Sequence, residues 1–186
     1  FEYVLTLYST DADLKAEDLL GQHASVRMKV GSTPERFFDG IVCEFGPTGY
    51  VRRYAVYRMV LRPWFWLLSR TRECRVFQQV TTRDIFEKIV NYKWGFTQVD
   101  VNLFYALQER EYCVQYRESD LAFLMRLLEE EGIYFYFKHE LGNHTLVLAD
   151  SVSAHDTVPG FETIGFKRVE HVDQDKPTGS MISWTS

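Results

Sequence analysis

Three consecutive carboxylates, Glu129, Glu130 and Glu131, are the side chains in this sequence that most readily suggest catalysis. Two carboxyl groups can hydrolyse a glycosidic bond when they face each other across the sugar, roughly 5–10 Å apart. Adjacent residues of a helix point in different directions around its axis, so these three cannot face one another. Because carboxylates at a helix C-terminus oppose the helix dipole, we expect compensation from Arg126, Arg117 or a base on another subunit. The sequence therefore predicts an acidic face and no catalytic residue.

Three histidines, His139, His144 and His155, follow within a short stretch. A turn over 140–143 should bring His139 and His144 together across a hairpin. Zinc binds three or four ligands that converge tetrahedrally, and a third ligand is not evident beside this pair. We expect hydrogen-bonded surface histidines here, and we predict neither a metal site nor a bound cofactor.

An aromatic run, Trp64-Phe65-Trp66, follows Pro63. Such rings can stack on sugars as a carbohydrate platform, or they can fill a core or cover its end. Aromatic side chains contribute strongly to core burial, so we favour the core interpretation.

The three cysteines, Cys43, Cys74 and Cys113, are widely spaced and form no CxxC pair. This pattern indicates neither a zinc ribbon nor a thioredoxin motif. Each lies in a strand-like run, so we expect reduced core thiols of a cytosolic protein. The sequence also lacks a nucleophile elbow, a phosphate-binding loop and the HExxH zinc motif.

Composition narrows the function classes further. The 186 residues are 46% hydrophobic and 16% aromatic, with a net charge of -5. Packed cores are therefore expected, and nucleic-acid binding has no obvious electrostatic source. No signal peptide opens the sequence, and the richest apolar run, Trp64 to Leu68, is too short to cross a membrane. The sequence starts and stops inside strand-like patterns, so we expect a fragment of a longer protein.

A strand, a helix and a hairpin are predicted between Tyr112 and Asp150. Alternation over 112–117 indicates a strand, and apolar residues at helical spacing indicate a helix over 120–131. Ser119 is one of the acceptors suited to the helix N-terminus, and Gly132 should end the helix with a positive φ. The hairpin then runs from Ile133 through the turn at 140–143 to Leu148.

Upstream of this stretch, several short strands should form a small barrel or sandwich. A strand over 1–8 precedes a short helix that is capped by Asp11 or Asp13 and ends before Gly21. Turns are predicted at 31–34 and 46–49, with a bulge at Gly40. A capping box over 81–84 begins a second helix at about 82–94, and a short helix is expected over 104–111.

The stretch that contains the strand, helix and hairpin reads YCVQYRESDLAFLMRLLEEEGIYFYF and later HTLVLADS. It resembles the N-terminal hub region of VgrG proteins, the spike of the type VI secretion system, and through them contractile-phage tail hubs. The resemblance extends upstream through LLGQHASVRMKV, RFFDGIVCEF and RPWFWLLSR, and it is looser from about Phe161.

With this resemblance we expect an α+β fold in three parts. Residues 1–78 would form a first antiparallel barrel-like domain. Residues 79–158 would form a helix-containing region packed on it, and 159–186 would start a second, truncated barrel-like domain.

The resemblance implies a structural, non-enzymatic role. VgrG proteins form homotrimers whose six barrels match the hexameric Hcp tube, and they meet baseplate and effector proteins. They assemble in the bacterial cytoplasm and are then secreted without a signal peptide. Two alternatives stay open at this point: a phage tail-hub protein, and a peptidoglycan hydrolase that uses Glu129 to Glu131.

Overall fold

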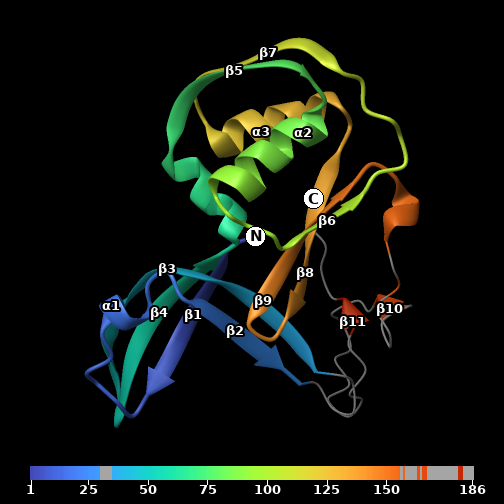
Figure 1. Cartoon of the computed structure of the whole chain (residues 1–186). Coiled ribbons are helices and arrows are strands. Elements are labelled where there is room, and N and C mark those ends of the chain that lie inside the picture. The colour runs from blue at the N-terminus through green and yellow to red at the C-terminus, as the bar shows by residue number, and fades with distance from the viewer. Residues whose placement is uncertain (30–34, 156, 158–162, 164, 167–179, 182–186) are drawn as a thin grey trace.

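The computed structural model of the chain describes residues 1–29, 35–155, 157, 163, 165–166 and 180–181. Its lower part is a four-stranded antiparallel sheet in the order β1-β4-β3-β2, which we call the first sheet (Figure 1). The strands are β1 (Tyr3–Ser9), β2 (His23–Met28), β3 (Arg36–Val51) and β4 (Tyr54–Arg62). Within the described residues this sheet is open, so a closed barrel is not seen.

The connection from β1 to β2 contains the one-turn helix α1 (Ala16–Leu19). The predicted cap was wrong, because Lys15 occupies the N-cap and provides no side-chain hydrogen bond. The carboxylate of Asp11 instead accepts the backbone N–H of Asp13 at 2.9 Å, which builds a turn before the helix. An acidic side chain can accept a nearby backbone N–H in a turn as readily as at a helix N-cap.

The turn predicted at 46–49 was also wrong, because this segment lies inside the long strand β3. The ladder to β4 shifts register between Pro47 and Gly49, and such a bulge lets a strand accommodate a proline. The chain turns instead after Val51, where Arg52 adopts a φ of 55°. The turn predicted at 31–34 lies outside the described residues.

The bulge predicted at Gly40 lies further along β3, between Val42 and Glu44. Gly40 itself pairs regularly with Ala24. A Cβ at Gly40 would lie 3.0 Å from Cβ of Leu61, so glycine is needed here for close approach between neighbouring strands.

Above the first sheet, β5 (Arg72–Val80) pairs antiparallel with β7 (Arg110–Ser119) in a separate two-stranded sheet, the β5–β7 ribbon. We expected the strands up to about Arg75 to share one sheet. A seven-residue 3₁₀ segment, η1 (Trp64–Arg70), instead leads the chain away from β4. The helices α2 (Thr82–Glu87) and α3 (Asp120–Glu130) lie beneath the ribbon (Figure 1).

The starts of α2 and α3 and the end of α3 follow their predicted local signals. Thr81 and Asp84 form the capping box of α2, and the helix continues as the π-helical turn η2 (Lys88–Lys93). The Ser119 hydroxyl accepts the N–H of Ala122 at the start of α3. Gly132 follows α3 with a φ of 69°, which confirms its predicted conformation.

A third sheet has the order β6-β9-β8, with β6 (Val99–Asn102), β8 (Tyr134–Glu140) and β9 (Asn143–Ala149). The β8–β9 hairpin is antiparallel, as expected, whereas β6 runs parallel to β9. The helix predicted over 104–111 was wrong. The Asp150 carboxylate accepts the backbone N–H groups of Phe104 and Tyr105 instead, which favours a turn over a helix.

Beyond β9 the described structure consists of the short 3₁₀ turn η3 (Val152–Ala154) and two short strands. β10 (Gly165–Phe166) and β11 (Ser180–Met181) pair in parallel. The second barrel-like domain predicted over 159–186 therefore lies mostly outside the described residues.

Two hydrophobic cores result. The larger one lies among the helices and contains Trp64, Phe65, Phe86, Phe123 and Leu146. The smaller one lies against the first sheet and is centred on Val42, Met59 and Leu61. No helix within the described ranges is both long and apolar enough to span a membrane.

The burial of the aromatic run confirms its predicted core role. Trp64 and Phe65 are each 2% exposed. Trp66 lies between two guanidinium groups, with the Cζ atoms of Arg62 and Arg70 at 4.7 and 4.0 Å from its ring. These three rings therefore do not form an open platform for a sugar.

Candidate functional site: a histidine clasp between two sheets

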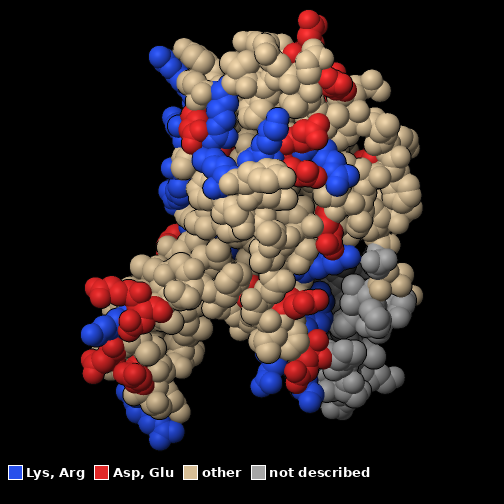
Figure 2. Space-filling model, viewed as in Figure 1, with Lys and Arg blue, Asp and Glu red and all other residues tan. Residues whose placement is uncertain are grey.

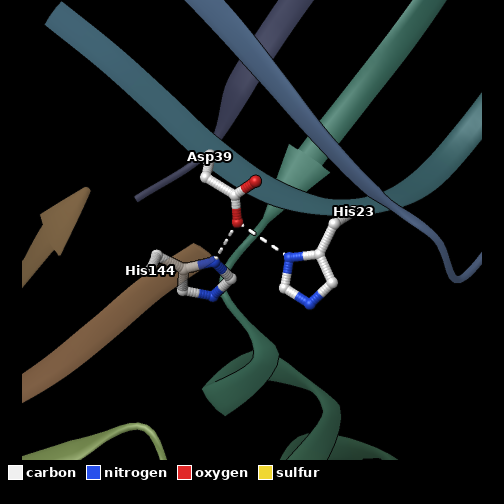
Figure 3. Close-up of side chains that lie close together, drawn as sticks. All are labelled: His23, Asp39 and His144. Carbon is white, nitrogen blue, oxygen red and sulfur yellow. Dashed lines mark hydrogen bonds and ion pairs between the residues drawn. The ribbon is translucent and has the colours of Figure 1, made fainter. Parts of the chain in front are cut away.

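Four polar side chains meet where the β8–β9 hairpin reaches the first sheet. They are His23 of β2, Asp39 of β3, His139 of β8 and His144 of β9, and we call them the histidine clasp. Oδ1 of Asp39 accepts hydrogen bonds from Nδ1 of His23 at 2.8 Å and from Nδ1 of His144 at 2.7 Å (Figure 3). Asp39 and His144 are fully buried, so this network is isolated from solvent at its centre.

The tautomer of His144 follows from its two neighbours. The backbone N–H of Trp64 donates to Nε2 of His144 at 2.9 Å, so this nitrogen carries no hydrogen. Nδ1 must then carry the hydrogen that it donates to Asp39. Both ring nitrogens are used, and the buried imidazole is satisfied only in its neutral form.

The tautomer of His139 follows in the same way, with the roles of its two ring nitrogens exchanged. The backbone N–H of Asp39 donates to Nδ1 of His139 at 3.1 Å. The hydrogen therefore sits on Nε2, which faces the hydroxyl oxygen of Tyr3 at 3.3 Å. Each of these two histidines thus accepts one backbone N–H that would otherwise be unpaired inside the protein.

Further bonds tie the clasp to the hairpin turn. The Ser25 hydroxyl donates to Oδ2 of Asp39 at 2.8 Å, and its oxygen accepts the N–H of Gly142 at 2.8 Å. The clasp therefore joins residues that are more than a hundred positions apart in sequence, and it connects the first sheet to the third.

Burial controls the protonation of the two hairpin histidines. It lowers the pKa of both His144 and His139, because a charged ring loses its hydration in the interior. The nearby Asp39 carboxylate acts in the opposite direction and only partly compensates.

The clasp corrects and completes the sequence interpretation of the histidines. His139 and His144 pair across the hairpin as predicted, with ring centroids 6.2 Å apart. They are not surface histidines, because His144 is buried and His139 partly so. His155 lies elsewhere and stacks on Tyr134 and Tyr136.

His23 and Asp39 were missed at the sequence level. The available signal was Asp39 itself, a carboxylate inside the apolar strand sequence RFFDGIVCEF. A buried carboxylate requires partners, but the sequence does not reveal which residues supply them.

His23, Asp39 and His144 present three ligand atoms within 4.8 Å of one another, a spacing that a metal ion could use. The hydrogen positions argue against such a site. A metal on Nδ1 of His144 would move the ring hydrogen to Nε2, where it would point at the N–H of Trp64. These residues therefore do not fit a metal in this arrangement, and the prediction of no metal site stays a prediction.

Two carboxylates of the acidic cluster, Glu130 and Glu131, form ion pairs within the chain. Arg110 binds Glu130 at 2.8 Å and Glu131 at 2.7 Å, and Arg126 approaches Glu130 at 3.3 Å. Arg126 was an expected partner, whereas Arg110 was not, and Arg117 makes no ion pair with the cluster among the interactions of the described residues. Figure 2 shows acidic and basic side chains interleaved over the part of the molecule that contains α2 and α3.

The cysteines are free thiols, but their environments differ. Cys113 is buried and Cys43 is partly buried, as expected for core thiols. Cys74 is exposed, which corrects the prediction. It faces outward because it alternates with the inward residues of β5, such as Phe77.

The middle of the outer face of the β5–β7 ribbon is uncharged, and the exposed Arg72 and Arg117 lie at its end. The uncharged residues are Cys74, Val76, Gln78, Tyr112, Val114 and Tyr116, all of them exposed. Tyrosine and aliphatic side chains of this kind are common in the contact surfaces of assembled proteins.

Comparison with known proteins explains this architecture. A family model for the phage tail baseplate hub (GPD) matches residues 1–186. The chain belongs to this hub family. The hub chain is 39% identical over 166 residues to the type VI secretion system spike protein VgrG1b of Pseudomonas aeruginosa, covering 89% of this chain and 22% of that protein.

The name of another relative states an additional function. The actin cross-linking toxin VgrG1 of Vibrio cholerae is 33% identical over 159 residues, covering 86% of this hub chain and 14% of that protein. The hub chain thus spans about a quarter or less of the length of these relatives.

Solved structures show the same fold. A type VI secretion component of Escherichia coli, described as similar to the T4 bacteriophage tail proteins gp27 and gp5, matches with a TM-score of 0.76 and 27% identity. The match covers 84% of this hub chain and 44% of that chain. The fold is also shared by the 43 kDa tail protein of prophage MuSo2 from Shewanella oneidensis, with a TM-score of 0.57 and 18% identity. That match covers 92% of this hub chain and 49% of the tail protein. The predicted resemblance to VgrG proteins is confirmed, and the hub chain stands among structural spike and hub proteins.

Proposed function

We propose that this chain is a rigid scaffold segment of a type VI secretion spike. The observation that carries the proposal is the match to named spike proteins at 39% identity over 89% of the chain. The segment would work in a homotrimer that docks on the hexameric Hcp tube and contacts baseplate and effector proteins. It would assemble in the bacterial cytoplasm and then be secreted.

Barrel formation is the finer part of this proposal. Within the described residues the edges of the first sheet at β1 and β2 are unpaired, and such edges are usually paired or covered in native proteins. We propose that residues 1–78 belong to one barrel-like unit, that 79–158 pack on it, and that 159–186 begin a second unit. Three subunits would then present six such units to the Hcp tube.

A non-enzymatic role agrees with the state of the carboxylates. Glu130 and Glu131 are held by arginine, and Glu131 also accepts the Thr82 hydroxyl at 2.9 Å. A catalytic pair would instead need two carboxyl groups that face a substrate. The uncharged middle of the outer face of the β5–β7 ribbon offers a contact surface, which is what an assembly role requires.

The test uses the full-length protein. Light scattering should give three copies per particle, and the particle should co-sediment with Hcp tubes. Replacement of Glu129, Glu130 and Glu131 by Gln should leave the clearing of a peptidoglycan suspension at the level of the buffer blank. A stable full-length monomer would overturn the assembly role. Wall-degrading activity that disappears with the Gln replacements would establish the hydrolase instead.

The phage alternative shares the fold and differs in the partner. The hub chain is similar to a prophage tail protein only at 18% identity, whereas its spike relatives reach 39%. We therefore favour the secretion spike. Co-sedimentation with a phage tail tube, but not with Hcp, would reverse this preference.

A further inference from the structure

We propose that the histidine clasp is an acid-sensitive latch, which holds the β8–β9 hairpin on the first sheet while His139 and His144 are neutral and releases it when they are protonated. The proposal goes beyond the assembly role and does not depend on it. It rests on the direction of two hydrogen bonds at the contact between the sheets.

Both hairpin histidines act as acceptors of backbone N–H groups. Trp64 donates to Nε2 of His144 at 2.9 Å, and Asp39 donates to Nδ1 of His139 at 3.1 Å. A protonated imidazole carries hydrogen on both nitrogens and can accept nothing. Protonation of either ring therefore places two donors against each other and leaves a backbone N–H without a partner.

The clasp has little capacity to absorb added charge. The ring centroids of His23 and His144 lie 5.6 Å apart, and those of His139 and His144 lie 6.2 Å apart. Among the described residues, Asp39 is the one carboxylate that forms hydrogen bonds with any of these rings, and its Oδ1 is already shared by His23 and His144. One protonated ring can pair with Asp39, but a second would repel the first at short range.

The groups around the clasp carry charges of both signs. Besides the residues of the clasp, several titratable or charged groups face it. Tyr3 and the α-amino group of Phe1 come from the N-terminal segment, and Glu35 and Arg36 come from the beginning of β3 and the residue before it. Lys138 comes from β8, and His155 shares with His139 a cavity of about 530 Å³. Trp64 contributes only its backbone N–H at the start of η1. Arg36 and Lys138 disfavour further positive charge whereas Glu35 favours it, so the limit rests on the sharing of Asp39.

The pH range follows from the two lowered pKa values. An unfolded chain takes up a proton on each histidine near pH 6.5, whereas the folded clasp resists it until the pH falls further. Between these limits the unfolded state binds more protons than the folded state, so stability falls as the pH falls. Each histidine lowers the ratio of folded to unfolded protein by up to about tenfold per pH unit in this window.

His23 supplies an internal contrast. Its Nδ1 donates to Asp39, but its ring accepts no backbone N–H among the hydrogen bonds of the described residues. Its side chain is also 43% exposed, so a proton there can be hydrated. The release therefore depends on the two hairpin histidines, which both accept backbone N–H groups.

Two measurements on the unmodified chain test the latch directly. Imidazole nitrogen shifts in NMR spectra should show hydrogen on Nδ1 of His144 and on Nε2 of His139 at pH 7.5. Exchange of the Trp64 and Asp39 amide protons, corrected for intrinsic pH effects, should accelerate at least tenfold between pH 7 and 5. Opposite tautomers, or protection that is unchanged across this range, would overturn the proposal.

A second test uses variants whose side chains still accept the backbone N–H but do not take up a proton in this pH range. In His139→Asn the amide oxygen takes the place of Nδ1, and in His144→Gln it takes the place of Nε2. The double variant should lose most of the pH dependence of urea unfolding between pH 7 and 5. His155→Gln, which removes a histidine outside the clasp, should retain it. If the double variant keeps the full dependence, the latch is wrong. If it does not fold, the amide-exchange result decides.

Discussion

The ammonium group of Lys93 lies 2.6 Å from Oδ2 of Asp120, a carboxylate with no exposed surface. Trp94 Nε1 and the Thr71 hydroxyl donate to the same oxygen at 2.9 and 3.1 Å, and Gln115 donates to Oδ1 at 2.9 Å. Asp120 thereby connects η1, η2, β7 and the first turn of α3 around one buried charge.

Replacement of Asp120 by Ala should lower the free energy of unfolding by about 3–5 kcal/mol, because the donors of Trp94, Thr71 and Gln115 lose their acceptor inside the protein. Lys93 is left with the more exposed Glu73 as its partner. Burial raises the pKa of Asp120, but hydrogen bonds from Lys93, Gln115 and Trp94 outweigh it and hold the pKa below its usual value. The stabilisation is therefore complete above the unfolded pKa and is lost as the pH falls through the folded one. Urea unfolding at pH 7 measures the loss, and exposed Asp100→Asn serves as control, with a change within about 0.5 kcal/mol.

Gly132→Ala should cost about 1–2 kcal/mol, and Gly132→Val at least as much. The φ of 69° is unfavourable for any residue with a Cβ, and nothing lies within 4 Å of the added atom, so the cost is conformational. Gly46→Ala is the matched control, because it also has open space but no positive φ. Equal melting temperatures for the two alanine variants would contradict this account.

Gly40→Ala should destabilise the protein for a different reason. The added methyl group would lie 3.0 Å from Cβ of Leu61 and 3.2 Å from the carbonyl oxygen of Arg62. Overpacking of this kind costs about 1–3 kcal/mol. Thermal unfolding should show the loss. The truncation Leu61→Ala in the same chain should not rescue it, because alanine keeps the Cβ that makes the contact.

Arg110→Met should cost about 1–2 kcal/mol, because Glu130 and Glu131 lose a shared partner at the C-terminal end of α3. The combined replacement of both glutamates by Gln should recover part of this loss. A double-mutant cycle measured by urea unfolding isolates the coupling. The exposed pair of Arg83 and Glu87, 2.8 Å apart, should show a coupling below about 0.5 kcal/mol.

Excess zinc should leave the melting temperature of the chain unchanged. A ligand that binds only the folded state raises stability in proportion to its occupancy, and the lone pairs of His139 and His144 already accept backbone hydrogens. A zinc-dependent rise that disappears in His23→Ala and His144→Gln would show that the clasp does bind metal.

Local signals allowed the helix ends to be predicted. The Ser119 cap, the capping box at Thr81 and the stop at Gly132 each depend on a few consecutive residues, and the structure contains all three. Where local signals competed, prediction was wrong: Pro47 marked a turn by composition, yet pairing with β4 keeps it in a strand. Tertiary pairing outweighs turn propensity at that position.

The candidate site was only half predictable. The hairpin register that pairs His139 with His144 follows from the turn between them. Asp39 lies 105 positions before His144, and no periodic pattern reports a contact across that distance. The partner of β5 was missed for the same reason, because β7 begins only after two helical segments and β6 have intervened.

Neighbouring residues of β3 serve different cores. Ile41 packs with the core among the helices, and Val42 packs with the core of the first sheet. Unfolding of either core removes β3 from its packing in the other core. We therefore expect the two cores to unfold in a single cooperative transition. Calorimetry should then record one heat-absorption peak whose calorimetric and van't Hoff enthalpies agree, although the interior is divided in two.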